Sequence, residues 1–385
     1  MEARKKRIEE LDILRGFALF GVLLVNMTMM HTSRTGFSVS RMGLEGINRL
    51  SALGIEIFFQ GKFYTIFSIL FGLGFYLFMN RRETDMRPFF LRRMILLLIF
   101  GILHMVVVWH GDILHTYALI GLVLFWRRDK SEEGILRGAL LWLLIAALLN
   151  GALTAMIEAP ELYRSMVTST MIPYADEIYS QGSYFSLLRY RLVHEVQSAP
   201  VDLLFILPKI LGLFYMGFYL GRKQLFQNLE RYRSRIKKTF QICAAASIVF
   251  IVMLLLVEPY TGGLVPYYAF AFLEGFLGDM LTLTGSAFYM SGILLLLGYR
   301  GWKKVLNPLK HMGKMALTNY LVQTVFWSFV FNGYGLGLYG QLPYWSFFPL
   351  ALIFFLLQIL FSKIWLKHRQ NGPMEALWRR FTYAG

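Results

Sequence analysis

Long apolar runs alternate with short charged connections along almost the whole chain. A helix needs about 20 apolar residues to cross a bilayer, and windows of roughly that length recur ten times. They are residues 13–30, 60–79, 93–110, 112–126, 136–157, 201–221, 239–257, 279–298, 314–332 and 346–366. This pattern predicts an all-α, polytopic membrane protein of about ten transmembrane helices.

The composition supports this class of protein. Of the 385 residues, 56% are hydrophobic and 16% are aromatic, and the mean hydropathy is +0.51, a value that soluble globular domains do not reach. Cys243 is the single cysteine. The chain therefore cannot build a disulfide framework or a thiolate metal cluster.

The net charge of +16 would suggest a nucleic-acid partner for a soluble protein, but here the basic residues follow the topology. If the N-terminus is cytoplasmic, 30 of the 39 Lys and Arg residues fall in cytoplasmic connections or termini. The positive-inside rule then places both termini in the cytoplasm. Segment 222–238, where Tyr and Phe interleave with the basic residues, suits anionic lipid headgroups, so we expect lipids and no nucleic acid as partners.

We predict one transmembrane domain, residues 1–385. Its one sizeable outer-face connection is the loop 158–200, which is rich in Tyr. The first apolar run lacks the small-residue cleavage site of a signal peptide, so we interpret it as a retained span. The GxGxxG match that begins at Gly335 lies in an outer connection without a preceding strand, and we interpret it as chance.

Polar side chains inside the apolar runs are the first candidates for function, because unpaired polar groups are costly in a bilayer. In "LDILRGFALFGVLLVNM", Asp12 and Arg15 lie at the predicted cytoplasmic start of the first span. Asn26 lies about 16 Å further across, at 1.5 Å per residue, and His104 reaches a comparable depth in the third span. Asp12 and Arg15 also fit a simple ion pair at the membrane boundary.

Three other segments place polar groups near the same level. The second and sixth spans carry Lys62 and Lys209, and "HMVVVWHGDILHTY" turns at the outer surface with Asp112 between His110 and His115. These two histidines fit solvated surface residues. The group lacks the regular spacing of a metal site, so we predict no metal.

Each of the remaining candidates also has a purely structural interpretation. His104 fits an interhelical hydrogen-bond donor, and Asp112 fits an N-cap at the start of a helix. Lys62 and Lys209 could extend toward the outer surface. "FGLGF" fits close helix packing at its glycines.

Six segments spread over nearly the whole chain carry a family resemblance. They are "RIEELDILRGFALFGVLLVNM", "QGKFYTIFSILFGLGF", "RRMILLLIFGILHMVVVWHGDILHTYALIGL", "MGKMALTNYLVQTVFW", "NGYGLGLYG" and "NGPMEALWRRFTY". Together they resemble the YeiB-like bacterial membrane proteins. The first segment is also similar to heparan-α-glucosaminide N-acetyltransferase. More distantly, it is similar to the membrane acyltransferases that decorate bacterial polysaccharides.

The resemblance implies a multi-pass protein of the bacterial plasma membrane that takes an acyl group from cytoplasmic acyl-CoA, such as acetyl-CoA. The acceptor would be a small molecule or a glycan at the outer face. The sequence leaves the oligomeric state open, and a homo-oligomer is one of the possible states. In the polysaccharide enzymes an Arg is followed eleven residues later by His, whereas Arg15 is followed at that spacing by Asn26. The base must therefore lie elsewhere, and His104 assisted by Asp112 is the best-placed substitute.

The other roles follow from what such an enzyme needs. Arg15, oriented by Asp12, and Arg222 would bind the CoA phosphates. Asn26 or Lys62 would donate to the developing oxyanion, and Lys209 would lie at the depth that the pantetheine arm reaches.

Two other functions stay open from the sequence. The same polar residues could line the substrate or proton path of a transporter or exporter, in which His104, Asp112 and Lys209 exchange protons. They could also serve only as contacts between helices in a structural or sensing protein.

Overall fold

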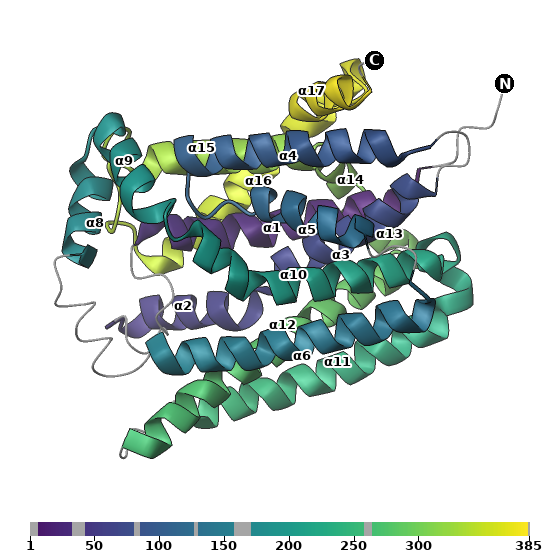
Figure 1. The fold of residues 1–385 in the computed structure, drawn as a ribbon, viewed down its shortest axis with the longest axis horizontal. Helices are drawn as coiled ribbons and strands as arrows, with labels where there is room; N and C mark the ends of the chain where they lie inside the picture. The colour runs from purple at the N-terminus through teal and green to yellow at the C-terminus, as the bar shows by residue number, and fades with distance from the viewer. Residues whose placement is uncertain are drawn as a thin grey trace.

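The fold is a bundle of long helices that run roughly along one common axis (Figure 1). A computed structural model describes residues 7–32, 43–80, 85–126, 130–157, 171–257 and 264–383. Every regular element within these ranges is helical, as the sequence predicts.

The chain forms these elements in order: α1 Glu9–His31, α2 Gly46–Phe58, α3 Lys62–Met79, α4 Arg87–Val107, α5 Leu114–Trp126, α6 Glu132–Ile157, α8 Met171–Gln181, α9 Tyr184–Tyr190, the π-helix η2 Arg191–Glu195, α10 Ala199–Arg222, the 3₁₀ turn η3 Leu225–Gln227, α11 Leu229–Val257, α12 Leu264–Leu296, α13 Arg300–Leu306, α14 Leu309–Lys314, α15 Ala316–Phe331, the 3₁₀ turn η4 Tyr344–Ser346, α16 Phe347–His368 and α17 Pro373–Thr382.

Eight stretches of the described residues are long and apolar enough to cross a membrane. They are α1, α2 with α3, α4, α6, α10, α11, α12, and η4 with α16. The predicted fourth and ninth spans hold α5 and α15, of 13 and 16 residues. At 1.5 Å per residue these helices are about 20 and 24 Å long, shorter than the roughly 30 Å hydrocarbon layer. The chain is thus a multi-pass membrane protein, while ten crossings and the side of each terminus remain predictions.

The two ends of the bundle differ. The start of α1, α14 and α17 lie at one end, which we call the basal end, and α8 and α9 lie at the other, which we call the capped end (Figure 1). Of the predicted outer loop 158–200, residues 171–200 hold α8, α9 and η2. Residues 158–170 lie outside the described part.

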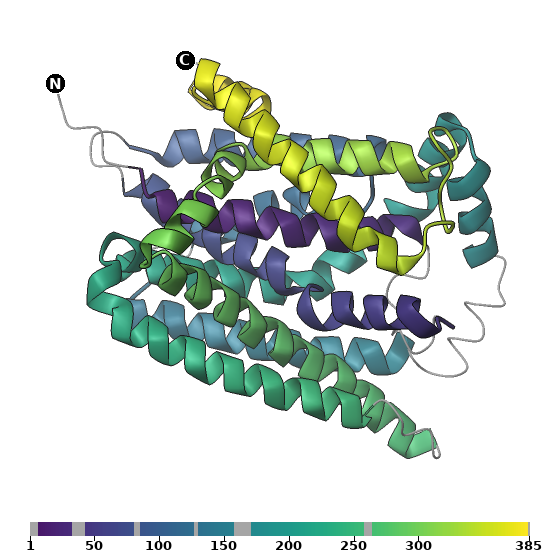
Figure 2. The ribbon, with the colours of Figure 1, turned by 180° about the vertical axis from the view of Figure 1, so that it is seen from behind.

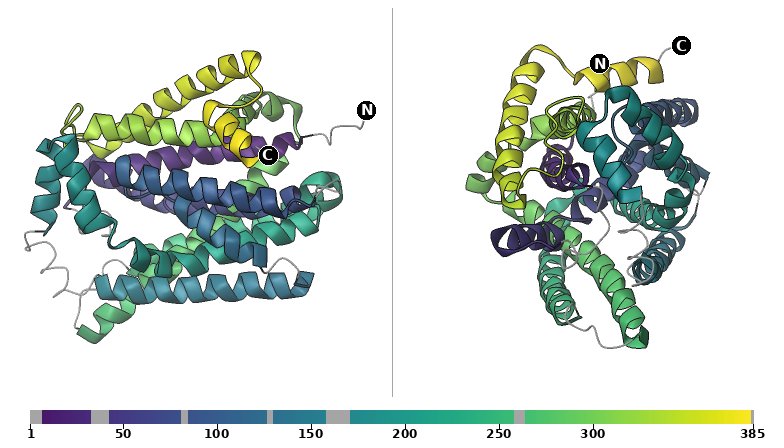
Figure 3. Two further views of the ribbon diagram at one scale, coloured as in Figure 1. Left: turned by 45° about the horizontal axis from the view of Figure 1, so that its top comes forward. Right: turned by 90° about the vertical axis from the view of Figure 1, so that its left-hand side faces the viewer.

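Helix α1 lies in the interior and α11 lies at the margin. Figure 3 shows α1, in purple, surrounded by other helices, and Figure 2 shows α11 paired with α12 along one edge of the bundle. The apolar window of α1 is 56% buried, against 6% for that of α11. Most of the apolar part of α1 therefore packs against other helices.

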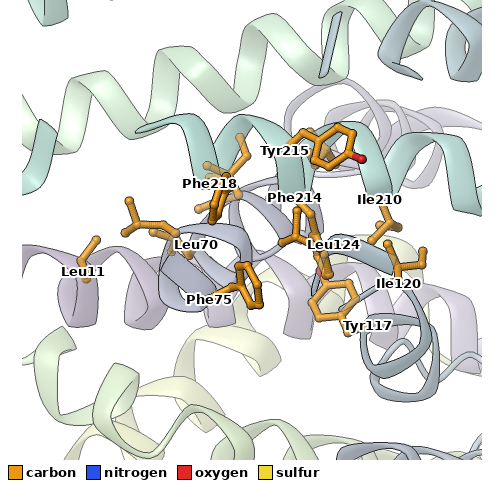
Figure 4. Packing of buried hydrophobic residues seen from close by; sticks show 14 of the residues in the cluster. Leu11, Leu70, Phe75, Tyr117, Ile120, Leu124, Ile210, Phe214, Tyr215 and Phe218 are labelled. Atoms are coloured by element: carbon orange, nitrogen blue, oxygen red, sulfur yellow. The ribbon is translucent and has the colours of Figure 1, made fainter. Parts of the chain in front are cut away.

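A core of aromatic and aliphatic side chains joins α3, α5 and α10 (Figure 4). The rings of Phe71 and Phe214 stack with centroids 4.7 Å apart. A side chain at Gly72 would collide with the backbone of Phe214. The expectation that "FGLGF" serves close helix packing is confirmed at this glycine.

Candidate functional site

One cavity of about 2260 Å³ extends through the bundle from the basal end to the capped end. Ordinary small-molecule pockets enclose about 300–1,000 Å³. Residues on and beside α1 line the cavity throughout, from Arg7 through Arg15 and Asn26 to Thr32. Because α1 is about 34 Å long, the cavity could hold an extended ligand that reaches from one end toward the other.

The basal mouth of the cavity is built around Asp12. This carboxylate is 2% exposed and accepts hydrogen bonds from Arg7 and from Nη1 of Arg15, the latter at 3.0 Å. The ion pair considered from the sequence is therefore present. The Arg15 side chain remains 27% exposed and lines the cavity, so the same pair orients a guanidinium toward the mouth.

Further cations line this end of the cavity. Arg93, Lys314 and Arg379 come from α4, α14 and α17, and the guanidinium carbon of Arg93 lies 3.9 Å from the centroid of the Trp378 ring. Arg222 is placed differently: it donates to the carbonyl oxygen of Lys130 at 2.6 Å and does not line the cavity. The mouth is thus suited to an anionic group, with Arg222 away from it.

The carboxylate of Asp112, at the turn between α4 and α5, gathers five donors. Oδ2 accepts from the backbone N–H of Leu114 at 2.8 Å and from the backbone N–H and Nδ1 of His115 at 3.1 and 3.2 Å. Oδ1 accepts from Nδ1 of His104 at 2.9 Å and from the hydroxyl of Tyr320 at 3.4 Å. Asp112 therefore caps α5, as the structural interpretation expected, and also holds two histidines.

These two histidines occupy different positions. His104 is 4% exposed, its Nε2 lies 2.6 Å from Oγ1 of Thr324, and it does not line the cavity. His115 does line the cavity, with Nε2 3.2 Å from the hydroxyl of Thr116. Since Asp112 accepts at Nδ1, Nε2 of His115 is the nitrogen left to accept a hydrogen bond, here from the hydroxyl of Thr116.

Lys62 lies at a break between two helices. Helix α2 ends at Phe58 and α3 begins at Lys62, with Gly61 between them at φ +79°. The ammonium of Lys62 is buried and donates to the carbonyl oxygens of Gln60 at 3.2 Å and Glu56 at 3.4 Å. It therefore occupies the carbonyl end of α2, where the helix dipole favours a cation, and does not extend to the surface.

Lys209 forms an ion pair in the interior. Its Nζ lies 2.5 Å from Oδ1 of Asp279 on α12 and 5.3 Å from the centroid of the Tyr64 ring. Lys209, Asp279 and Lys62 all line the cavity. A second buried polar centre thus lies beside the helix break.

At the capped end, a carboxylate and a histidine join η2 to the turn after α4. Glu195 pairs with Nδ1 of His110 at 3.2 Å and accepts from the hydroxyl of Tyr179 at 2.5 Å. Burial alone would raise the pKa of Glu195, but the hydrogen bonds from His110 and Tyr179 outweigh it, so this pKa lies below its ordinary value. His110 thus anchors the cap, and its side chain is 42% exposed.

Sequence reasoning missed Asp279, Thr324 and the cavity position of His115. Asp279 stands at the edge of the predicted span 279–298, where it looks like a boundary charge. Thr324 is 220 residues from His104, and a hydroxyl in an apolar helix carries no signal of its own. For His115 the signal was present, because it is three residues from Asp112 on the first turn of α5.

Comparison with known proteins gives a consistent set of relatives. A family described as "Protein of unknown function (DUF418)" matches residues 220–385. The chain is 27% identical to the uncharacterized protein YxaH of Bacillus subtilis, over 98% of this chain and 94% of YxaH. It is 29% identical to an uncharacterized 39.9 kDa protein from the amylase 3′ region of Bacillus acidopullulyticus (99% and 95% covered) and 26% identical to the uncharacterized protein YeiB of Escherichia coli (97% and 95%).

Proposed function

We propose, from the premise that this chain belongs to the YeiB-like family of multi-pass membrane proteins, that it is a membrane acyltransferase. It would take an acyl group from acyl-CoA, such as acetyl-CoA, and pass it to an acceptor inside the bundle. One observation carries the proposal: a single cavity connects a cationic mouth at Arg15 to the Asp112–His115 pair. The basic connections at the basal end favour the cytoplasm of a bacterium as the donor side.

The donor site would be the basal mouth. Arg15, Arg93, Lys314 and Arg379 offer positive charge for the phosphates of CoA. The narrow pantetheine arm and its thioester would then extend along α1. We leave Arg222 out of this site because it lies off the cavity.

The chemistry needs one base and one oxyanion donor. Nε2 of His115 would take the proton from the acceptor hydroxyl or amine as its oxygen or nitrogen bonds to the thioester carbonyl carbon. Asn26 or Lys62, which both line the cavity, would donate to the oxyanion. The C–S bond then breaks, and the proton on His115 passes to the departing CoA thiolate.

In this scheme His104 is a positioning residue. It holds Oδ1 of Asp112 while Oδ2 holds His115, and unlike His115 it does not line the cavity. The base expected from the sequence at His104 is thus proposed at the neighbouring histidine on the same carboxylate.

The test is binding and turnover of radiolabelled acetyl-CoA by the purified full-length protein in detergent. We expect saturable binding and release of free CoA. Arg15→Gln should weaken binding about tenfold, since a hydrogen bond to a charged group contributes about 1.5–3 kcal/mol. Arg222→Gln, a basal arginine off the cavity, is the matched control and should leave binding unchanged. Absence of acetyl-CoA binding, or equal losses in the two variants, would overturn the donor site.

A transporter is the second candidate, and the helix break favours it. Discontinuous helices with buried charges near the middle of a bundle form the substrate sites of many secondary transporters, and Gly61, Lys62 and the Lys209–Asp279 pair have that arrangement. This function predicts flux across liposomes that responds to a proton gradient, without consumption of a thioester.

A further inference from the structure

We infer that the acceptor is a membrane lipid whose hydrocarbon chain enters the cavity sideways at Gly278, an inference that rests on the acyltransferase proposed above. The lipid headgroup would carry the hydroxyl or amine that receives the acyl group.

The first observation is the composition of the cavity walls toward the capped end. Five apolar side chains from α2, α6 and α11 line it there: Ile57, Leu153, Ile157, Leu254 and Leu255. Helix α11 packs along α12 at the edge of the bundle (Figure 2). Its apolar window is 6% buried and that of α6 is 22% buried, so most of both helices faces lipid. A cavity wall built from such helices borders the bilayer.

The second observation is depth. Lys238 is the last charged residue of α11, and Leu254 lies 16 residues beyond it, about 24 Å along the helix. A hydrocarbon layer is about 30 Å thick, so Leu254 lies within the layer, in its half toward the capped end. The apolar side chains at this depth fit a lipid chain, and Asn150, Thr154 and Glu274 line the cavity beside them.

The third observation is open space next to polar groups. A side chain at Gly278 would meet no atom within 4 Å, although Gly278 lines the cavity. The adjacent Asp279 pairs with Lys209, and Asn150 donates to the carbonyl oxygen of Gly275 at 2.8 Å on the facing helix. The apolar walls therefore lead to polar groups inside the bundle, which is the pattern that an amphipathic guest needs.

The reaction follows from this placement. The headgroup oxygen or nitrogen forms the new bond to the acyl carbon as the C–S bond of the thioester breaks. Its proton moves through His115 to the CoA thiolate, so the products are an acylated lipid and free CoA. The acyl product leaves by the same lateral route.

The experiment fills the open space and compares it with an equivalent change elsewhere. Gly278→Leu should block the chain, whereas Gly54→Leu is the matched control. Gly54 lies on α2, also has no atom within 4 Å of an added Cβ, and does not line the cavity. Both variants go into vesicles of phosphatidylethanolamine and phosphatidylglycerol that contain phosphatidylethanolamine with a diazirine on its chain.

Two readouts are then taken. Photolysis should cross-link the probe to peptides of α6 and α11 that face the cavity, and Gly278→Leu should reduce this labelling about tenfold while Gly54→Leu does not. With radiolabelled acetyl-CoA, label should appear in the organic-solvent extract for wild type and fall similarly in Gly278→Leu. Binding of acetyl-CoA at the basal mouth should stay unchanged in both variants.

The outcomes separate the two proposals. Unchanged cross-linking in Gly278→Leu, or label that enters only water-soluble products, overturns the lipid acceptor and leaves the acyltransferase standing. Cross-linking that depends on Gly278 in a protein that binds no acetyl-CoA supports the lipid site and overturns the acyltransferase.

Discussion

The two buried polar centres of the cavity differ in how their charges are held. Asp112 accepts from two backbone N–H groups, two histidines and a tyrosine hydroxyl. The Lys209–Asp279 pair joins two helices through one contact between residues 70 positions apart, beside the break at Gly61. The first centre fixes the orientation of two histidine rings, and the second balances one charge against another. Loss of a single group should therefore affect chemistry at the first centre and stability at the second.

The largest effect is expected at His115. His115→Gln removes the proposed base and should lower kcat for acyl transfer about 10²–10⁴-fold, with little change in the unfolding temperature, because Asp112 still caps α5. His104→Gln should cost only about tenfold, since His104 acts through Asp112. Single-turnover measurements of acyl transfer compare the two variants, and the loss in His115→Gln should exceed that in His104→Gln. A larger loss at His104 would reverse the assignment.

The next effect concerns the stability of the second centre. Asp279→Leu leaves Lys209 buried without its partner and should lower the free energy of unfolding by about 3–5 kcal/mol. The double variant Lys209→Met/Asp279→Leu removes both charges and should recover most of this loss. Unfolding in mixed micelles, followed by circular dichroism, measures both. If the double variant is as unstable as the single one, the unpaired charge of Lys209 is not the cause of the instability, and the contact between the two side chains itself stabilises the fold.

The apolar pattern predicts the membrane-spanning helices well because the thickness of the hydrocarbon layer dictates the length of each apolar run. Each of the ten predicted windows contains a helix. Helix α2 was not expected, however, because Gly46–Phe58 stands outside those windows. The break that follows α2 depends on the positive φ of Gly61 and on Thr282 of α12, which lies next to it. An apolar count carries no information about either.

The site was predictable only where its members are close in sequence. His104 and Asp112 were paired in advance because a turn joins them. The partner of Lys209 and the hydroxyl of Thr324 come from helices 70 and 220 residues away. Which histidine faces the cavity depends on the rotation of α4 and α5 against their neighbours, and this rotation is set by packing.

The smallest effect tests whether the helix break is built into the fold. Gly61→Ala adds a Cβ at φ +79°, 2.7 Å from Oγ1 of Thr282, and should lower the free energy of unfolding by about 1–3 kcal/mol. Gly54→Ala, inside α2 with no atom within 4 Å of its added Cβ, should raise it by up to about 1 kcal/mol, because alanine is the better helix former. The same unfolding assay compares the two. Opposite signs locate the strain at the break itself, whereas a gain of stability in both variants would mean that α2 and α3 tolerate a continuous helix. In that case Lys62 would have no carbonyl end to occupy.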